Sequence, residues 1–232
     1  MRQLFRAVLA LSFAVLAVPA AAFAGEEPQA APARPASSSG GPGVRAYFVT
    51  DFNSMSASKS FDAALDTSHL TAFGGGADVV DLWKHLFARF SVTHVSKTGS
   101  RAFFDGVDVV SLGIPLTVSM TPVEIGGGWR FSGAPAPRLT PYAGGGVVIV
   151  SYKETSEFSD ASDNFSGSFT GYNLFGGAEF SLTNWLVAAG EAQFRSVPNA
   201  LGDNPTGLSQ AFKETDLGGF TLRVTIGIRT RR

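Results

Sequence analysis

The sequence predicts an all-β protein, an eight-stranded antiparallel up-and-down transmembrane β-barrel. Three observations predict it: short segments that alternate apolar and polar residues, connections that alternate between long and short, and charges confined to one face of the strands. In the last segment, 219–230, every second residue is apolar: Phe220, Leu222, Val224, Ile226 and Ile228. Because neighbouring side chains of a strand point to opposite faces, one face of this segment is wholly apolar.

The first 43 residues are expected to precede the barrel. Residues 1–24 combine a basic start, an apolar run and the small-residue site Ala22-Phe23-Ala24, a combination typical of a cleaved secretory signal peptide. An uncleaved anchor helix is disfavoured, because the apolar run is shorter than the roughly 20 residues that span a bilayer. Residues 25–43 are mainly Pro, Ala, Ser and Gly, and we interpret them as a flexible linker before a barrel domain over 44–232.

Composition narrows the possible partners and cofactors. The sequence has no cysteine, so an exported chain would depend on sheet closure rather than on disulfides for stability. Without residues 1–24 it has 16 basic and 19 acidic residues, a formal charge of −3, which argues against nucleic acid as a partner. No cofactor or metal site is expected, because there is no Cys/His cluster and the acids of 155–164 lack the spacing of an EF-hand.

The strand pattern begins at Val44. Eight strands are predicted, at 44–54, 70–82, 85–97, 115–131, 139–154, 165–182, 186–197 and 217–230. Long connections at 55–69, 98–114, 155–164 and 198–216 alternate with tight turns at 83–84, 132–138 and 183–185. Barrels of the bacterial outer membrane have this asymmetry, with short periplasmic turns and long extracellular loops.

The alternation also predicts a strand register. Pairing Leu182 with Leu186 across the turn 183–185 places Glu191 opposite Gly177, so that polar residues meet on one side of the hairpin. The fourth strand breaks the pattern, because Met120 belongs to one apolar series and Ile125 to the other. An extra residue inverts the faces of a strand and a proline cannot donate to the ladder, so we predict a bulge at Thr121-Pro122.

Charged residues decide which face meets lipid. The face opposite the apolar one carries a set that we predict to form a charge network in the lumen: Arg89, Glu124, Glu179, Glu191, Arg195 and Arg223. An Arg or Lys on the lipid face at the membrane midplane would cost roughly 2–4 kcal/mol, so the charges are placed inside. The lumen is then expected to be largely plugged, since eight strands leave an interior that side chains nearly fill.

Aromatic residues are predicted at both rims of the apolar band, where membrane barrels carry aromatic girdles. The residues assigned to these interfaces are Trp83, Trp129, Tyr142, Tyr152 and Trp185. The three tryptophans lie at or beside the short turns, and the two tyrosines end an alternating series of the fifth strand that we assign to the lipid face.

These features resemble the small eight-stranded outer-membrane β-barrels of Gram-negative bacteria, the class that includes the transmembrane domain of outer membrane protein A. The segments that carry the resemblance are Leu139–Val147, Gly171–Glu179 and Gly219–Ile228, and it covers residues 44–232. The resemblance implies an outer-membrane location, with outer-membrane lipid and the barrel-assembly machinery as partners. Proteins of this class usually end on an aromatic residue, whereas this sequence ends in Arg229-Thr-Arg-Arg232.

The leading functional hypothesis is a non-catalytic structural or surface-interaction protein, with four extracellular loops that could bind an extracellular ligand. The alternatives are a narrow porin-like channel, a secreted lipocalin-like barrel with its charges outside, and a lipid-modifying enzyme. In an enzyme His94 would act with Ser91 or Ser96, although Ser91 falls on the opposite face. Glu179 and Glu191, about 7–8 Å apart by strand spacing, would suit an inverting glycosidase, but pairing with arginines is the plainer role.

Overall fold

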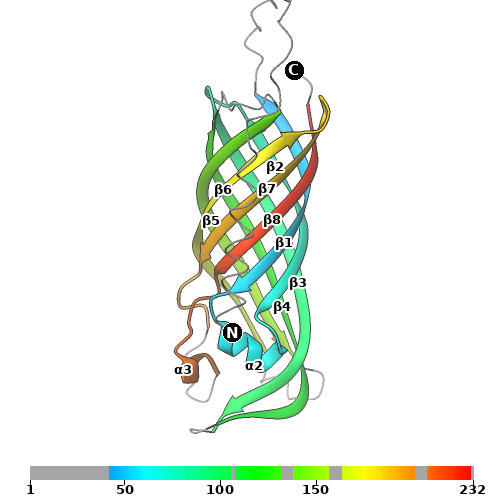
Figure 1. The fold of residues 1–232 in the computed structure, drawn as a ribbon. Helices are drawn as coiled ribbons and strands as arrows, with labels where there is room; N and C mark the ends of the chain where they lie inside the picture. Colours follow the sequence, from blue (N-terminus) through cyan, green and yellow to red (C-terminus); the bar gives the residue numbers. More distant parts are fainter. Residues whose placement is uncertain (1–41, 106–107, 132–137, 157–163, 202–207, 231–232) are drawn as a thin grey trace, which may run out of the picture. The chain divides into compact units, whose positions relative to one another are not determined.

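A closed barrel of eight antiparallel strands forms the body of the protein (Figure 1). The computed structural model describes residues 42–105, 108–131, 138–156, 164–201 and 208–230, so the predicted signal peptide and most of the linker lie outside the described residues. The strands are β1 (Gly43–Met55), β2 (His69–Val80), β3 (Leu86–Phe104), β4 (Val109–Arg130), β5 (Leu139–Thr155), β6 (Phe165–Ser181), β7 (Leu186–Ser196) and β8 (Gly219–Arg229). Each strand pairs with its neighbours in sequence and β8 closes on β1, which confirms the predicted up-and-down topology.

The predicted register of the β6–β7 hairpin is also confirmed, because Gly177 lies opposite Glu191 and Asn173 opposite Arg195. The bulge predicted at Thr121-Pro122 is wrong. β4 pairs with β5 in one unbroken register across this point, and the irregularity on the other side of β4 lies much farther out, between Ser100 and Ala102 of β3. Along β4 the apolar side chains therefore move from the outward to the inward positions, although the alternation of the backbone is not interrupted.

One side of the barrel is taller than the other. β3, β4, β5 and β6 have 19, 22, 17 and 17 residues, whereas β1, β2, β7 and β8 have 13, 12, 11 and 11. All eight strands meet at the end with the tight turns, the short-turn end, so the extra length projects at the opposite, long-loop end (Figure 1). Most of the predicted loop 98–114 is therefore strand.

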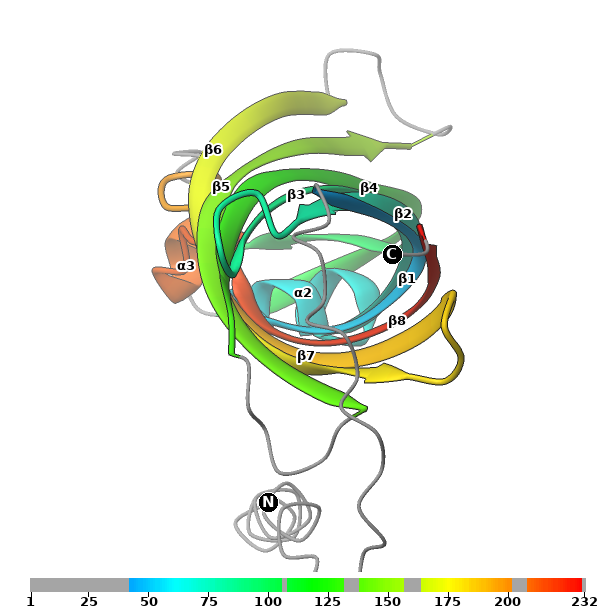
Figure 2. The ribbon, with the colours of Figure 1, turned by 90° about the horizontal axis from the view of Figure 1, so that it is seen from above.

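The long connections carry two helices, α2 (Ser58–Leu65) and α3 (Leu208–Phe212), where open loops were predicted. α2 lies at the long-loop end in Figure 1 and within the ring of strands in the axial view of Figure 2. Its buried Phe61 and Leu65 belong to the apolar core of the barrel. Glu214 fixes its first turn, accepting hydrogen bonds from the backbone of Ser60 at 2.9 Å and of Lys59 at 3.2 Å. No described helix has the length and apolarity to cross a membrane.

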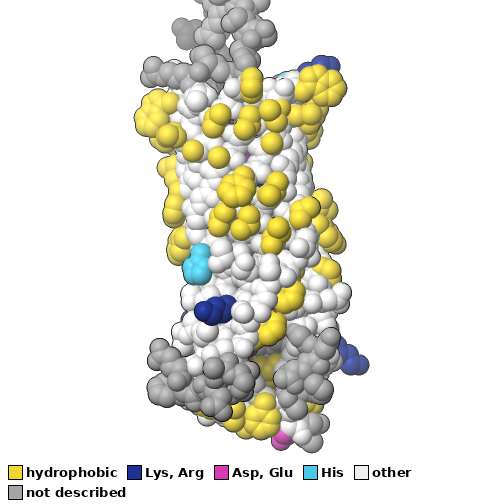
Figure 3. All heavy atoms as spheres, turned by 180° about the vertical axis from the view of Figure 1, so that it is seen from behind, with side chains coloured by type: hydrophobic (Ala, Val, Ile, Leu, Met, Phe, Trp, Pro, Cys, Tyr) yellow, Lys and Arg dark blue, Asp and Glu magenta, His cyan; other side chains and the backbone are white. Residues whose placement is uncertain are grey.

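An apolar belt covers the outer wall toward the short-turn end. Its large side chains are about half exposed and come from all eight strands, among them Phe48, Phe73, Phe90, Ile125, Val147, Leu174, Phe194 and Val224. Beyond the belt, toward the long-loop end, the outer wall of β3–β6 is mostly polar. Figure 3 shows both zones, with yellow side chains over the upper wall and a mainly white surface below them.

Candidate functional site

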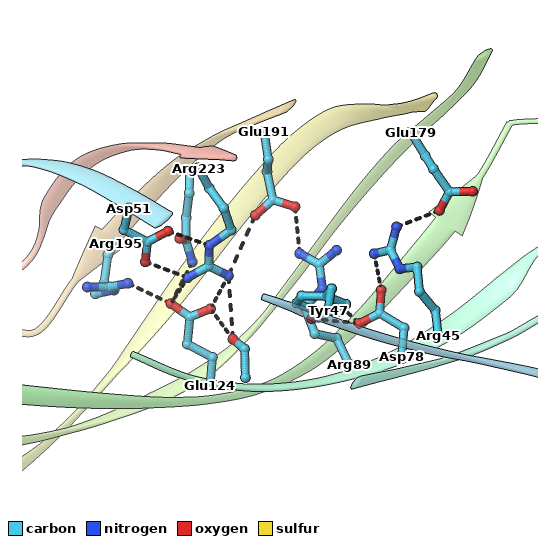
Figure 4. A network of polar contacts seen from close by, with 12 residues as sticks. Arg45, Tyr47, Asp51, Asp78, Arg89, Glu124, Glu179, Glu191, Arg195 and Arg223 are labelled. Carbon is cyan, nitrogen blue, oxygen red and sulfur yellow. Dashed lines mark hydrogen bonds and ion pairs between the residues drawn. The ribbon is translucent and has the colours of Figure 1, made fainter. Parts of the chain in front are cut away.

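The interior of the barrel brings all six predicted charged residues into one network. Five further charged residues belong to it or to its rim: Arg45, Asp51, Asp78, Arg130 and Arg229. The links alternate in sign, so that almost every carboxylate is held between arginines (Figure 4). The network runs inward from the short-turn end to the middle of the barrel. Two groups of contacts, one at the middle and one near the rim, make up the network.

Arg223 is the centre of the middle group. Its Nε and Nη2 donate to both carboxylate oxygens of Asp51, at 2.7 and 2.8 Å, and its Nη1 lies 2.8 Å from Oε2 of Glu124. Glu124 also accepts from Arg195 at 2.6 Å, Gln193 at 3.0 Å and the Ser91 hydroxyl at 3.0 Å. Arg223 is among the largest fully buried side chains of the described chain. A charge so far from water is stable only with such partners.

Glu179 is the centre of the rim group. It accepts from Arg45 at 2.5 Å and from both terminal nitrogens of Arg130 at 3.0 and 3.1 Å. Arg229, at the outermost edge, lies 3.4 Å away. The Glu179 side chain is only 1% exposed, so its charge is compensated almost entirely by these guanidinium groups.

Asp78 and Glu191 connect the two groups. Asp78 pairs with Arg45 and accepts from Tyr47 at 2.9 Å and from Arg89 at 3.3 Å. Arg89 in turn donates to Glu191 at 2.5 Å, and Glu191 lies 3.9 Å from Arg223. Glu179 and Glu191 are thus both engaged by arginines, which leaves no free carboxylate pair of the glycosidase type at this place.

An aromatic cluster packs beside the network. Phe87, Tyr142 and Phe175 contact one another with ring centroids 5.9–6.4 Å apart, and the Arg89 guanidinium lies 4.5 Å from the centroid of Phe175. The assignment of Tyr142 to the lipid interface is therefore wrong, because its side chain is buried inside the barrel. An arginine over aromatic faces is stabilised by the ring quadrupoles as well as by its carboxylates.

An apolar core fills the long-loop end of the interior. It consists of inward side chains of the strands together with α2 and the segments after β7 and before β8, including Phe61, Leu65, Val118, Met120, Val148, Val150, Val197 and Leu217. Tyr152 belongs to this core, and its hydroxyl donates to Glu154, so its assignment to the lipid interface is also wrong. Both faces of β5 are apolar over this stretch, and alternation alone could not tell the inner face from the outer.

Three buried charged residues escaped the sequence analysis: Arg45, Asp51 and Asp78. The first two share the inward phase of β1 with Tyr47 and Val49, opposite the outward Phe48 and Phe52, so the alternation of β1 contained the signal. Asp78 gave none, because both phases of β2 are largely apolar around it. The predicted interface residues Trp83, Trp129 and Trp185 are exposed at or beside the short turns.

The residues considered for catalysis form hydrogen bonds with other side chains rather than with one another. Ser91 faces inward and donates to Glu124, whereas the Nδ1 of His94 lies outside, 2.9 Å from the Thr121 hydroxyl. Ser96 is paired with the Ser119 hydroxyl at 3.0 Å. Within the described residues, no group of three His, Asp or Glu side chains is placed to hold a metal ion.

Several solved structures with the same architecture are outer-membrane proteins. No protein-family model matches the sequence, and no curated protein matches it. The outer membrane protein OprG from Pseudomonas aeruginosa superposes with a TM-score of 0.53 at 12% identity, over 82% of this chain and 96% of that one. Ail, the attachment invasion locus protein of Yersinia pestis, gives 0.48 at 12% identity, over 82% and 99%. The chain therefore has the fold of the small eight-stranded outer-membrane β-barrels, as the resemblance implied, and carries outside it the apolar belt that such barrels present to lipid.

Proposed function

We propose that this chain is a non-conducting, non-catalytic outer-membrane barrel whose role lies in the surface that it presents at the long-loop end. The observation that carries the proposal is the filled interior: the charge network and the apolar core follow one another along the barrel, and α2 covers the end. Ion pairs close the first of these two regions, and apolar packing closes the second.

The charge network resists the entry of ions because its members already satisfy one another. Five carboxylates (Asp51, Asp78, Glu124, Glu179 and Glu191) and four arginines (Arg45, Arg89, Arg195 and Arg223) are buried there. A permeating ion would have to separate buried pairs, and breaking one such pair costs about 3–5 kcal/mol. An eight-stranded barrel has no spare width around such a cluster.

The apolar core adds a second barrier of a different kind. Val118, Met120, Val148 and Val150 point inward from β4 and β5, and Phe61 and Leu65 of α2 belong to the same buried cluster at the open end. Dry apolar packing offers a hydrated ion no ligands, and emptying it would forfeit the burial of these side chains. A surface-interaction role is what remains for a barrel that is closed in this way.

Conductance across a planar lipid bilayer tests the proposal. The mature chain is refolded, and its folding is verified by the faster migration of the unboiled sample. We expect no discrete current steps from the native chain. The variant that combines Asp51→Ala, Glu124→Ala and Arg223→Ala with Phe61→Ala, Leu65→Ala and Met120→Ala removes the middle of the network and part of the apolar core. It serves as the opened control, in which intermittent steps are expected. Regular steps from the native chain would overturn the proposal in favour of a narrow channel.

A further inference from the structure

A patch of polar side chains covers the outer wall of β3–β6 directly beyond the apolar belt (Figure 3). The registers of these strands align outward side chains in rows across all four of them. The row next to the belt is His94, Thr121, Ser151 and Ser168, and the next row is Ser96, Ser119, Lys153 and Ser166. We call these two rows the hydroxyl patch.

Hydrogen bonds order the side chains of the patch on β3 and β4. His94 Nδ1 lies 2.9 Å from the Thr121 hydroxyl, and the hydroxyls of Ser96 and Ser119 are 3.0 Å apart. Lys153 is exposed beside them on β5. The acidic residues of these four strands, Glu124, Glu154 and Glu179, all have the inward phase, so the patch is neutral to basic.

The patch is hollowed. A groove of about 550 Å³ opens on the outer wall, and its lining includes His94, Ser119, Thr121, Ser151, Lys153 and Ser166. The groove therefore collects a cation, a histidine and several hydroxyls from four different strands. A Lys ammonium binds phosphate oxygens as a point charge, and hydroxyl groups both donate and accept hydrogen bonds, as sugar hydroxyls do.

The position of the groove beside the belt favours a lipid as its occupant. On the short-turn side, the outward positions of the same four strands are occupied by the exposed Phe90, Ile125, Val147 and Leu174 of the belt. A molecule that fills the groove and continues along this wall must have a polar head in the groove and apolar chains toward the short-turn end. A soluble ligand would leave the adjacent belt to membrane lipid and gain nothing from its position.

The height of the polar wall indicates which kind of lipid head group would fit it. Val123 is the outward residue of β4 at the edge of the belt, and Thr117 pairs with Thr98 in a third polar row. They are six residues apart, or about 20 Å along a strand. At the usual barrel tilt of about 40° this is about 15 Å along the axis. The interfacial layer of an ordinary bilayer is only about 5–8 Å deep on each side, so a taller, sugar-bearing head matches the wall better than a phospholipid head does.

We propose that the hydroxyl patch binds the phosphorylated saccharide head of an outer-leaflet glycolipid. Lys153 and His94 approach the phosphate, the serine and threonine hydroxyls bind the sugar, and the acyl chains lie along the belt of β3–β6. This inference rests on the proposed outer-membrane placement, and it deepens the proposed function by naming one molecule that the outer surface takes up.

The test compares retention of two lipids by the folded barrel in detergent, measured by native mass spectrometry. Lipid A, whose head is a phosphorylated disaccharide, is the probe, and phosphatidylglycerol, an anionic lipid without sugar, is the competitor. The test variant is His94→Ala, Lys153→Ala. The matched control, His69→Ala, Lys84→Ala, removes one exposed histidine and one lysine that lie outside the groove.

We expect the native chain and the control variant to prefer lipid A over phosphatidylglycerol by at least about tenfold, and the test variant to lose about tenfold in lipid A binding, as loss of a charge-assisted contact to phosphate would cause. Equal retention of both lipids by the native chain, or undiminished lipid A binding by the test variant, would overturn the inference. Heat-modifiable migration and conductance on the same samples report on the proposed function separately, so its failure would be distinguished from failure of this inference.

Discussion

β4 passes through two regions of the barrel. In one its outward side chains are apolar and its inward side chains polar, and in the other the polarity of the two faces is exchanged. Near the short-turn end its outward Ile125 is 58% exposed in the apolar belt, and its inward Glu124 is 3% exposed in the charge network. Six residues farther out, the outward residue is Ser119 and the inward Met120 is buried in the apolar core. The backbone does not change phase between these two regions.

The difference shows that the two ends of one strand can be adapted to different surroundings. In the belt region the medium outside is lipid, so apolar groups face outward and charges can be held only inside, in pairs. Beyond the belt the surroundings of the outer wall are polar, so the rule for soluble sheets applies and the apolar face turns to the core. One half of the barrel therefore has the side-chain distribution of a transmembrane β-barrel, and the other half has that of a soluble β-barrel.

The largest effect is expected inside the belt region. Arg223→Ala leaves Asp51 and Glu124 buried without their main partner, and this should lower the free energy of unfolding by about 3–5 kcal/mol. Urea unfolding of the barrel in lipid vesicles, followed by tryptophan fluorescence, measures the change. Arg229→Ala is the matched control, since Arg229 is partly exposed at the rim, and it should cost less than about 1 kcal/mol. Equal losses in both variants would contradict the role given to the buried network.

The reversal itself is tested by placing one charge on the same face of the same strand at two heights. Ile125→Arg exposes a guanidinium to lipid and should cost about 2–4 kcal/mol. Ser119→Arg lies beyond the belt and should cost less than about 1 kcal/mol, because water reaches its side chain. The same unfolding assay compares them. A Ser119→Arg penalty as large as that of Ile125→Arg would place the lipid boundary farther out than we infer.

A smaller effect is expected where α2 covers the core. Glu214→Ala removes an acceptor from the first turn of α2 and should cost about 1–2 kcal/mol locally. Faster hydrogen exchange across 58–65 is the expected readout, with the strands unchanged. Asp62→Ala on the exposed side of α2 removes a carboxylate of the same helix without that contact and should leave exchange unaltered. If both variants exchange alike, Glu214 does not hold the helix.

The sequence was sufficient for the parts of the barrel where the two faces differ. β6, β7 and β8 alternate cleanly, because lipid on one side and paired charges on the other demand opposite residue types, and their faces and the register between Gly177 and Glu191 could be predicted. The central charges Glu124 and Arg223 followed from the same argument.

The rest could not be predicted, because it depends on where the membrane ends. A change of face at Thr121-Pro122 looks the same in the sequence whether the backbone slips or the solvent changes, and we expected a bulge where the second explanation holds. For the same reason Tyr152 was placed at the lipid interface, although it lies in a core that exists only beyond the belt. α2 has only eight residues and is stabilised by tertiary contacts such as Glu214, which local sequence does not reveal.

The measurement that tests the reversal most directly is single-cysteine labelling along the outward face of β4 in lipid vesicles. The chain has no cysteine, so each introduced thiol is unique. Thr117→Cys, Ser119→Cys and Thr121→Cys should react readily with a water-soluble maleimide, whereas Val123→Cys and Ile125→Cys should react only after unfolding. Protection of all five thiols would contradict the account, and so would protection of Thr117→Cys and Ser119→Cys, which a bulge at Thr121-Pro122 would turn inward.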